Sequence, residues 1–117
     1  MRSPRRGEIY LLKGDKVGKN RPVLVVSPLQ LNGGFSVLAV PFYSQQLARR
    51  ASMSTCVYFA SGEFGLNANC VAKTDEVSIY RISELSVSDG PIGTVDDVRM
   101  EEVSGAMSVS LGITPFR

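Results

Sequence analysis

Hydrophobic and polar positions follow the two-residue period of β-strands, or form short apolar runs, over most of the first 80 residues. Residues 6–12 alternate apolar and polar side chains, which predicts a strand with one buried face. Continuous apolar runs predict two further strands at residues 23–26 and 35–42. The glycine-rich stretch at residues 32–34 predicts a turn between them and therefore an antiparallel pair.

The segments after residue 44 are shorter and more polar. Residues 45–53 are compatible with a helical turn or a loop, whereas residues 54–60 and 69–80 are rich in strand-forming side chains. Residues 81–85 can form a single helical turn, and residues 91–95 resume a short extended segment. The chain therefore consists mainly of strands up to residue 80.

A helical period occurs only at the end, over residues 96–111. Its apolar positions recur at intervals of three and four on one face, at Met100, Val103, Met107 and Leu111. Asp96 is a suitable N-cap, and Gly112 and Pro115 end the helix. The pattern predicts a small curled sheet or partial barrel of antiparallel strands, with its open side covered by this helix.

Length and composition limit the class of protein. The 117 residues are enough for one domain, residues 1–117, and we expect residues 1–5 to be a flexible basic extension. No apolar stretch is long enough to cross a bilayer and no signal core follows the N-terminus, so we predict a cytoplasmic protein that contacts no membrane. The sequence contains no histidine, which excludes a Ser-His-Asp hydrolase. Cys56 and Cys70 show no metal spacing, and we interpret them as buried free thiols.

Charge is distributed unevenly along the chain. Residues 1–50 carry nine Lys or Arg and two acidic residues, a net charge of +7, whereas residues 51–117 carry four and nine, a net charge of −5. If the first strands share one face, that face is a cationic groove that attracts phosphate backbones. The alternative is a set of solvated loop charges. The donors in question are Arg5, Arg6, Lys13, Lys16, Lys19, Arg21, Arg49 and Arg50.

Arg21 stands where the predicted strand at residues 23–26 begins. Pro22 restricts Arg21 to extended geometry, so the guanidinium leaves the sheet in a defined direction. That placement suits a binding group. The alternative is a structural ion pair with Glu8 or Asp75.

Five segments in a fixed order carry a family resemblance. They are RRGEIYLL, NRPVLVVSPLQLN, VLAVPFYSQ, VAKTDEVSI and IGTVDDVRMEEVSGAMSVSLGI. From Arg6 to Ile113 the chain resembles the MazF/PemK (Kid-like) family of toxin ribonucleases. The resemblance implies an SH3-like β-barrel of the CcdB/Kid/MazF type and a homodimer. It also implies cleavage of single-stranded RNA without a cofactor, and neutralisation by a cognate antitoxin of a type II system.

The resemblance also implies roles for individual residues. Arg21 matches the essential arginine of the family, whose planar fork can hold two phosphate oxygens. Asp75 matches the carboxylate that acts as base, and Lys73 matches the cation that acts as acid or stabiliser. We place Lys73 and Asp75 two apart on one strand, so that both face the same side. A surface ion pair explains them almost as well.

The sequence departs from the family at the end of the strand over residues 35–42. Tyr43 stands where the family has its catalytic threonine, and Ser44 is the nearest hydroxyl and a further catalytic candidate, although neighbours on a strand face opposite ways. The Tyr43 phenol can bind a phosphate or stack a base, or alternatively pack at the barrel rim. The first loop is also shorter than is typical of the family. The candidate RNA-binding residues are Tyr43, Gln45, Lys16, Lys19, Arg49 and Arg50.

Two alternatives to a nuclease stay open. The same fold serves CcdB-like gyrase poisons, which act through the C-terminal helix and do no chemistry. The replacement at Tyr43 and the short first loop are compatible with a degenerate member that binds antitoxin or nucleic acid without cutting.

Overall fold

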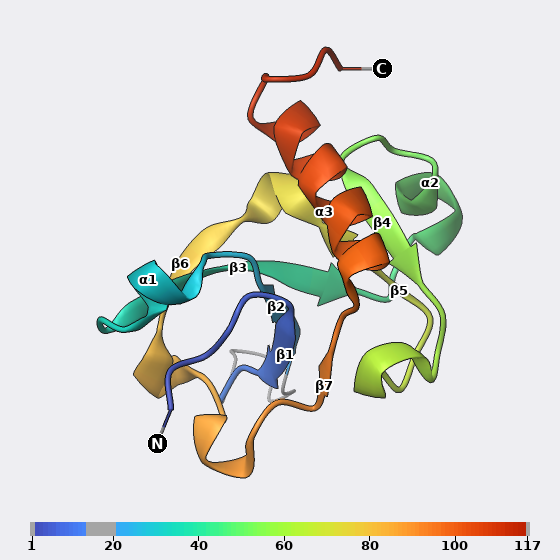
Figure 1. The fold of residues 1–117 in the computed structure, drawn as a ribbon. Coiled ribbons are helices and arrows are strands. Elements are labelled where there is room, and N and C mark those ends of the chain that lie inside the picture. Colours follow the sequence, from blue (N-terminus) through green and yellow to red (C-terminus); the bar gives the residue numbers. More distant parts are fainter. Residues whose placement is uncertain (1, 14–20, 117) are drawn as a thin grey trace.

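The computed structural model describes residues 2–13 and 21–116, which form a curled antiparallel sheet crossed by one long helix (Figure 1). Within these residues the strands follow the order β4-β5-β3-β2-β1-β7, and β6 also pairs with β3. The sheet curls into a half-barrel, which confirms the predicted mainly β fold with a C-terminal helix. The strands are β1 (Glu8–Leu11), β2 (Pro22–Val25), β3 (Ser36–Tyr43), β4 (Cys56–Phe59), β5 (Cys70–Lys73), β6 (Ser78–Arg81) and β7 (Gly93–Thr94). The helices are α1 (Leu29–Asn32), α2 (Leu47–Ala51) and α3 (Asp97–Ser110).

Strand β2 lies inside the fold and is buried on both faces. Leu24 and the following Val26 pack in the core beneath α3, whereas Val23 and Val25 pack on the opposite face with Leu85. Successive side chains of a strand point to opposite faces. Burial of both faces therefore explains why this segment is a continuous apolar run rather than an alternating one.

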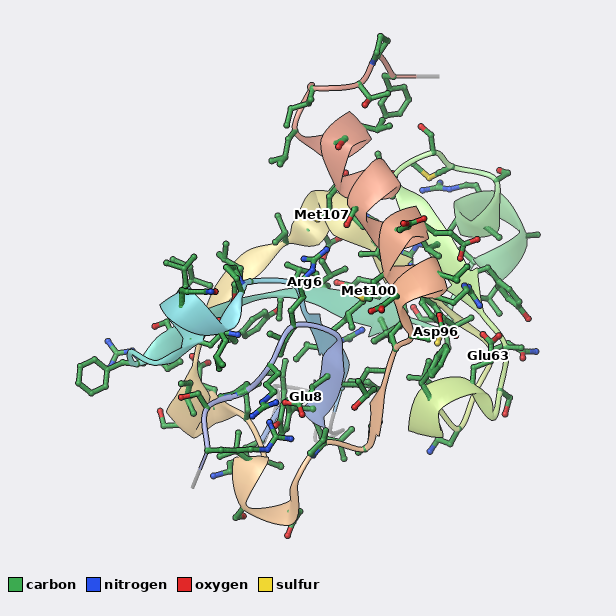
Figure 2. The ribbon with its side chains drawn as sticks, viewed as in Figure 1. Arg6, Glu8, Glu63, Asp96, Met100 and Met107 are labelled. Carbon is green, nitrogen blue, oxygen red and sulfur yellow. The ribbon has the colours of Figure 1, made fainter. Side chains whose placement is uncertain are left out.

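Helix α3 begins as the sequence predicts. The side chain of Asp96 accepts a hydrogen bond from the backbone N of Arg99 at 2.8 Å. Met100 (Figure 2) is buried against the sheet, and so is Val103. The apolar face is shorter than predicted, because the side chain of Leu111 is 60% exposed. None of the described helices is long and apolar enough to span a membrane.

Arg6 joins α3 to the sheet. Its guanidinium donates to the carbonyl of Val26 and, at 2.7 Å, to the hydroxyl of Ser104 on α3 (Figure 2). These bonds direct the side chain toward the helix. Arg6 therefore has a structural role in joining α3 to the sheet.

At Pro41 the strand that pairs with β3 on the side away from β2 changes. The carbonyl of Leu38 accepts a hydrogen bond from the backbone N of Val26. The N–H and C=O groups of even-numbered residues of β3 therefore point toward β2, and those of odd-numbered residues point toward the neighbour on the opposite side. Pro41 lacks an N–H on that other side. There the pairing changes from β6 to β5, and the intervening chain forms a 3-10 turn at Thr74–Glu76. The segment rich in strand-forming side chains therefore holds two strands, β5 and β6, with a turn between them.

The N-terminal residues predicted to be a flexible extension contact the sheet. Pro4 is fully buried, and its carbonyl accepts a hydrogen bond from Asn32 at 2.9 Å. Glu8, which is 3% exposed, pairs with the guanidinium of Arg2 and accepts hydrogen bonds from the Arg5 backbone N at 2.7 Å and the Tyr10 hydroxyl at 2.9 Å. Burial raises the pKa of Glu8, but these bonds outweigh burial and the pKa is lowered.

Replacing Glu8 by Gln is expected to lower the free energy of unfolding by about 2 kcal/mol, because Gln keeps the shape but loses the charge that Arg2 pairs with. The stabilising effect of Glu8 is present above its ordinary pKa of 4.5 and is lost as pH falls through the lowered folded pKa. Urea denaturation should therefore show the difference between wild type and Glu8→Gln shrinking on acidification. The pKa of Tyr10, raised mainly by burial and also by Glu8 to about 12, should fall in the variant. Glu101→Gln, an exposed change on α3, is the matched control.

Two glycines allow a close crossing of the chain. A Cβ atom on Gly93 would lie 1.8 Å from the carbonyl oxygen of Phe64, and one on Gly65 would lie 2.0 Å from that of Ile92. Both obstacles are backbone atoms and cannot rotate away. The turn before β5 and strand β7 can therefore approach each other only because neither residue carries a side chain.

We expect Gly93→Ala to destabilise the fold by about 3 kcal/mol or more, because the added methyl group forces two backbone segments apart. Gly105→Ala on the exposed side of α3 meets nothing within 4 Å and should stabilise the protein by about 0.5 to 1 kcal/mol through helix propensity. Thermal unfolding followed by circular dichroism separates the two variants. Equal melting temperatures would contradict the close crossing.

Candidate functional site

Arg21 is held in a defined direction at the start of β2. Its carbonyl accepts a hydrogen bond from the backbone N of Leu12 at 2.9 Å. Its guanidinium donates to the carbonyl of Phe42 at 3.1 Å and lies over the Tyr43 ring, 4.4 Å from the ring centroid. The side chain therefore crosses the end of β3. Glu8, one of the pairing partners considered for it, is bound instead to the N-terminal residues and Tyr10.

Tyr43, the last residue of β3, stands at the centre of a group of charged side chains. The guanidinium of Arg50 also lies over its ring, 4.7 Å from the centroid, and cations in this position are attracted by the π electrons. The phenol donates a hydrogen bond to Glu76 Oε1 at 2.5 Å. Burial, followed by the bond to Glu76, raises the pKa of Tyr43, so the phenol stays protonated at neutral pH.

Lys73 connects two carboxylates beside Tyr43. Its Nζ lies 2.8 Å from Asp75 Oδ2 and 2.9 Å from Glu76 Oε2. The Lys73 side chain is only 15% exposed, whereas those of Asp75 and Glu76 are 39% and 42% exposed. Hydrogen bonds to Asp75 and then to Glu76 raise the pKa of Lys73, and the bonds from Tyr43 and Lys73 lower the pKa of Glu76. Lys73 and Glu76 are therefore both charged at neutral pH.

Lys73 and Asp75 meet for a different reason from the one predicted. Lys73 ends β5, but Asp75 lies in the 3-10 turn Thr74–Glu76 rather than two positions further along the same strand. The turn folds both carboxylates back toward the Lys73 ammonium. It also brings in Glu76, which the sequence analysis did not identify. We call the six side chains together the Tyr43 cluster; they are Arg21, Tyr43, Arg50, Lys73, Asp75 and Glu76.

Arg50 reaches the Tyr43 cluster because the chain reverses after β3. Gln46 has a left-handed backbone with φ of 54°, which turns the chain into α2. From that helix Arg50 Nη1 donates to the carbonyl of Gln45 at 3.2 Å. The backbone of Gln45, rather than its exposed side chain, thus takes part in the site.

The remaining predicted site residues do not join the Tyr43 cluster among the described contacts. Ser44 is exposed and lines a separate hollow of about 100 Å³ with Pro22, Phe42 and Cys70. Arg49 is exposed on α2. Lys16 and Lys19 lie outside the described residues.

A family model described as the PemK-like, MazF-like toxin of type II toxin–antitoxin systems matches residues 5–111. The chain belongs to this toxin family. No curated protein matched the sequence.

Solved structures of similar fold carry related descriptions. An endoribonuclease in complex with its cognate antitoxin, from a Mycobacterial species, is 23% identical with a TM-score of 0.75, covering 96% of this chain and 98% of that one. An endoribonuclease from a Mycobacterial species is 24% identical with a TM-score of 0.72, covering 100% and 98%. A MazE-MazF structure from Deinococcus radiodurans is 20% identical with a TM-score of 0.73, covering 97% and 100%. At these identities the structural likeness shows a shared fold. This member of the PemK/MazF-like family has the ring of Tyr43 at the centre of its charged cluster.

Proposed function

We propose that this PemK/MazF-like toxin is a metal-independent endoribonuclease that cleaves single-stranded RNA, and that the Tyr43 cluster is its active site. The observation that carries the proposal is the convergence of a guanidinium, an ammonium, a phenol and two carboxylates at one end of the half-barrel. Similar folds described as endoribonucleases support it.

The reaction needs a base, an acid and cations near one phosphate. In the proposed step, the Asp75 carboxylate takes the proton of an RNA 2′-hydroxyl, and the 2′-oxygen forms a bond to the adjacent phosphorus. The bond from phosphorus to the 5′-oxygen breaks, and Lys73 supplies a proton to that oxygen. Arg21 binds the phosphate oxygens, whose charge grows in the transition state. The products are a 2′,3′-cyclic phosphate and a 5′-hydroxyl.

The cations over Tyr43 favour one way of holding the substrate. Arg21 and Arg50 both lie over its ring, so we assign the phosphate to these guanidinium groups rather than a stacked base to the ring. Ser44, Gln45 and Arg49 follow on the same stretch of chain and stay candidates for contacts with neighbouring nucleotides.

Partner proteins also belong to the proposal. Similar structures are described as complexes with an antitoxin or as MazE-MazF, and we infer that a cognate antitoxin binds this chain. A homodimer and a cytoplasmic location stay predictions.

Wild-type protein should cleave a long unstructured RNA in the presence of EDTA, and Arg21→Ala should lower the rate by about 100- to 1000-fold because a donor to the transition-state charge is lost. Gel analysis measures the cleavage rates of wild type and Arg21→Ala, and detection of cyclic phosphate ends identifies the product. Arg81→Ala, which removes an exposed arginine of β6, is the matched control for charge and should keep the wild-type rate.

Two results contradict the proposed nuclease. Cleavage that needs a divalent cation would reject the metal-independent mechanism. Absence of cleavage together with inhibition of gyrase would favour the CcdB-like alternative.

A further inference from the structure

Asp75 and Glu76 are neighbours, but they hold different positions in the Tyr43 cluster. Among the described contacts, Asp75 bonds to the Lys73 ammonium and to no other member. Glu76 bonds with one oxygen to the Tyr43 phenol and with the other to Lys73. Glu76 is therefore the carboxylate that links the ammonium to the ring on which Arg21 rests.

This link fixes the direction of two groups that otherwise rotate. A phenol hydroxyl turns about its C–O bond, and a lysine ammonium has three donors on a flexible stem. With its proton directed at Glu76, the Tyr43 oxygen presents its lone pairs to other groups. Lys73 uses one donor for each carboxylate, which leaves a third for a substrate oxygen.

Glu76 also balances the charge of the cluster. Arg21, Arg50 and Lys73 carry three positive charges, and Asp75 and Glu76 carry two negative ones. Without the Glu76 charge the three cations would face one carboxylate. Their mutual repulsion would rise, and Lys73 would be held by Asp75 alone.

We propose that Glu76 is the positioning residue of this site, orienting the Tyr43 hydroxyl and the Lys73 ammonium beside the phosphate that Arg21 binds. The proposal rests on the proposed ribonuclease function. It assigns to Glu76 a task that depends on the tyrosine at position 43, where the family resemblance places a threonine.

The first test is steady-state cleavage of a short fluorescent RNA by Glu76→Gln. Because misplacement of reacting groups by about 1 Å can lower a rate about 100-fold, we expect kcat to fall by about 10- to 100-fold, while KM stays the same or falls because the phosphate still meets Arg21. Glu76→Asp keeps the charge and should recover part of the loss. Glu101→Gln removes an exposed carboxylate of α3 and should keep wild-type kcat.

The second test asks whether Glu76 and Tyr43 act together. The loss in Glu76→Gln/Tyr43→Phe should be much smaller than the product of the two single losses, because both changes act on the same contact. Tyr43→Phe removes the phenol donor, and Glu76→Gln removes the charge of its acceptor. The losses in Asp75→Asn/Tyr43→Phe should instead multiply, because Asp75 and Tyr43 share no described contact.

The third test does not depend on activity. NMR of protein labelled with [¹³Cζ]tyrosine follows each phenol through its titration, and Tyr43→Phe identifies the Tyr43 signal. Glu76→Gln should lower the pKa of Tyr43, because the negative charge that helps to raise it is removed and the bond to the phenol is no longer made by a charged acceptor. Glu101→Gln should leave that pKa in place.

The outcomes separate this proposal from the proposed function. An unchanged Tyr43 titration in Glu76→Gln, or losses for Glu76 and Tyr43 that multiply, would overturn the role of Glu76. If wild-type protein cleaves no RNA, the ribonuclease proposal fails, and the NMR titration alone then decides whether Glu76 orients the phenol.

Discussion

The missing N–H of Pro41 is the constraint on which the arrangement of the site depends. Because β3 offers no donor there toward its second neighbour, that neighbour divides into β5 and β6, and the chain between them forms the turn Thr74–Glu76. The hydroxyl of Thr74 bonds to the Thr55 carbonyl at 2.6 Å and lies 2.8 Å from the hydroxyl of Ser110 on α3. The interruption of the sheet is thus anchored from two sides, and it presents its carboxylates next to the end of β3.

Four arginines of the first half of the chain fall into two pairs with different tasks. Arg2 supports the fold by pairing with Glu8, and Arg6 supports it by joining the carbonyl of Val26 to the hydroxyl of Ser104 on α3. Arg21 and Arg50 converge on Tyr43. Charge along the sequence does not distinguish these tasks, because each depends on which acceptor the folded chain brings within reach.

Much of the fold could be predicted from local pattern. The apolar run of β2 reflects its burial on both faces, and the period of α3 reflects the burial of Met100, Val103 and Ala106 against the sheet. The division of residues 69–80 could not be predicted in this way, because its cause lies in a different segment, at Pro41. Glu76 was missed for the same reason. On a continuous strand it would face away from Lys73, whereas in a 3-10 turn it returns to the same side.

The bond between Tyr43 and Glu76 makes two positions far apart in the sequence depend on each other in the folded protein. A threonine at position 43 is too short to span the distance that the phenol covers, so it would leave the carboxylate without that donor. Opposite a threonine, a glutamate at position 76 would keep the bond to Lys73 and lose the bond to the phenol. Homologous toxins are therefore expected to show covariation at these positions, with an aromatic hydroxyl at one accompanied by an acidic side chain at the other.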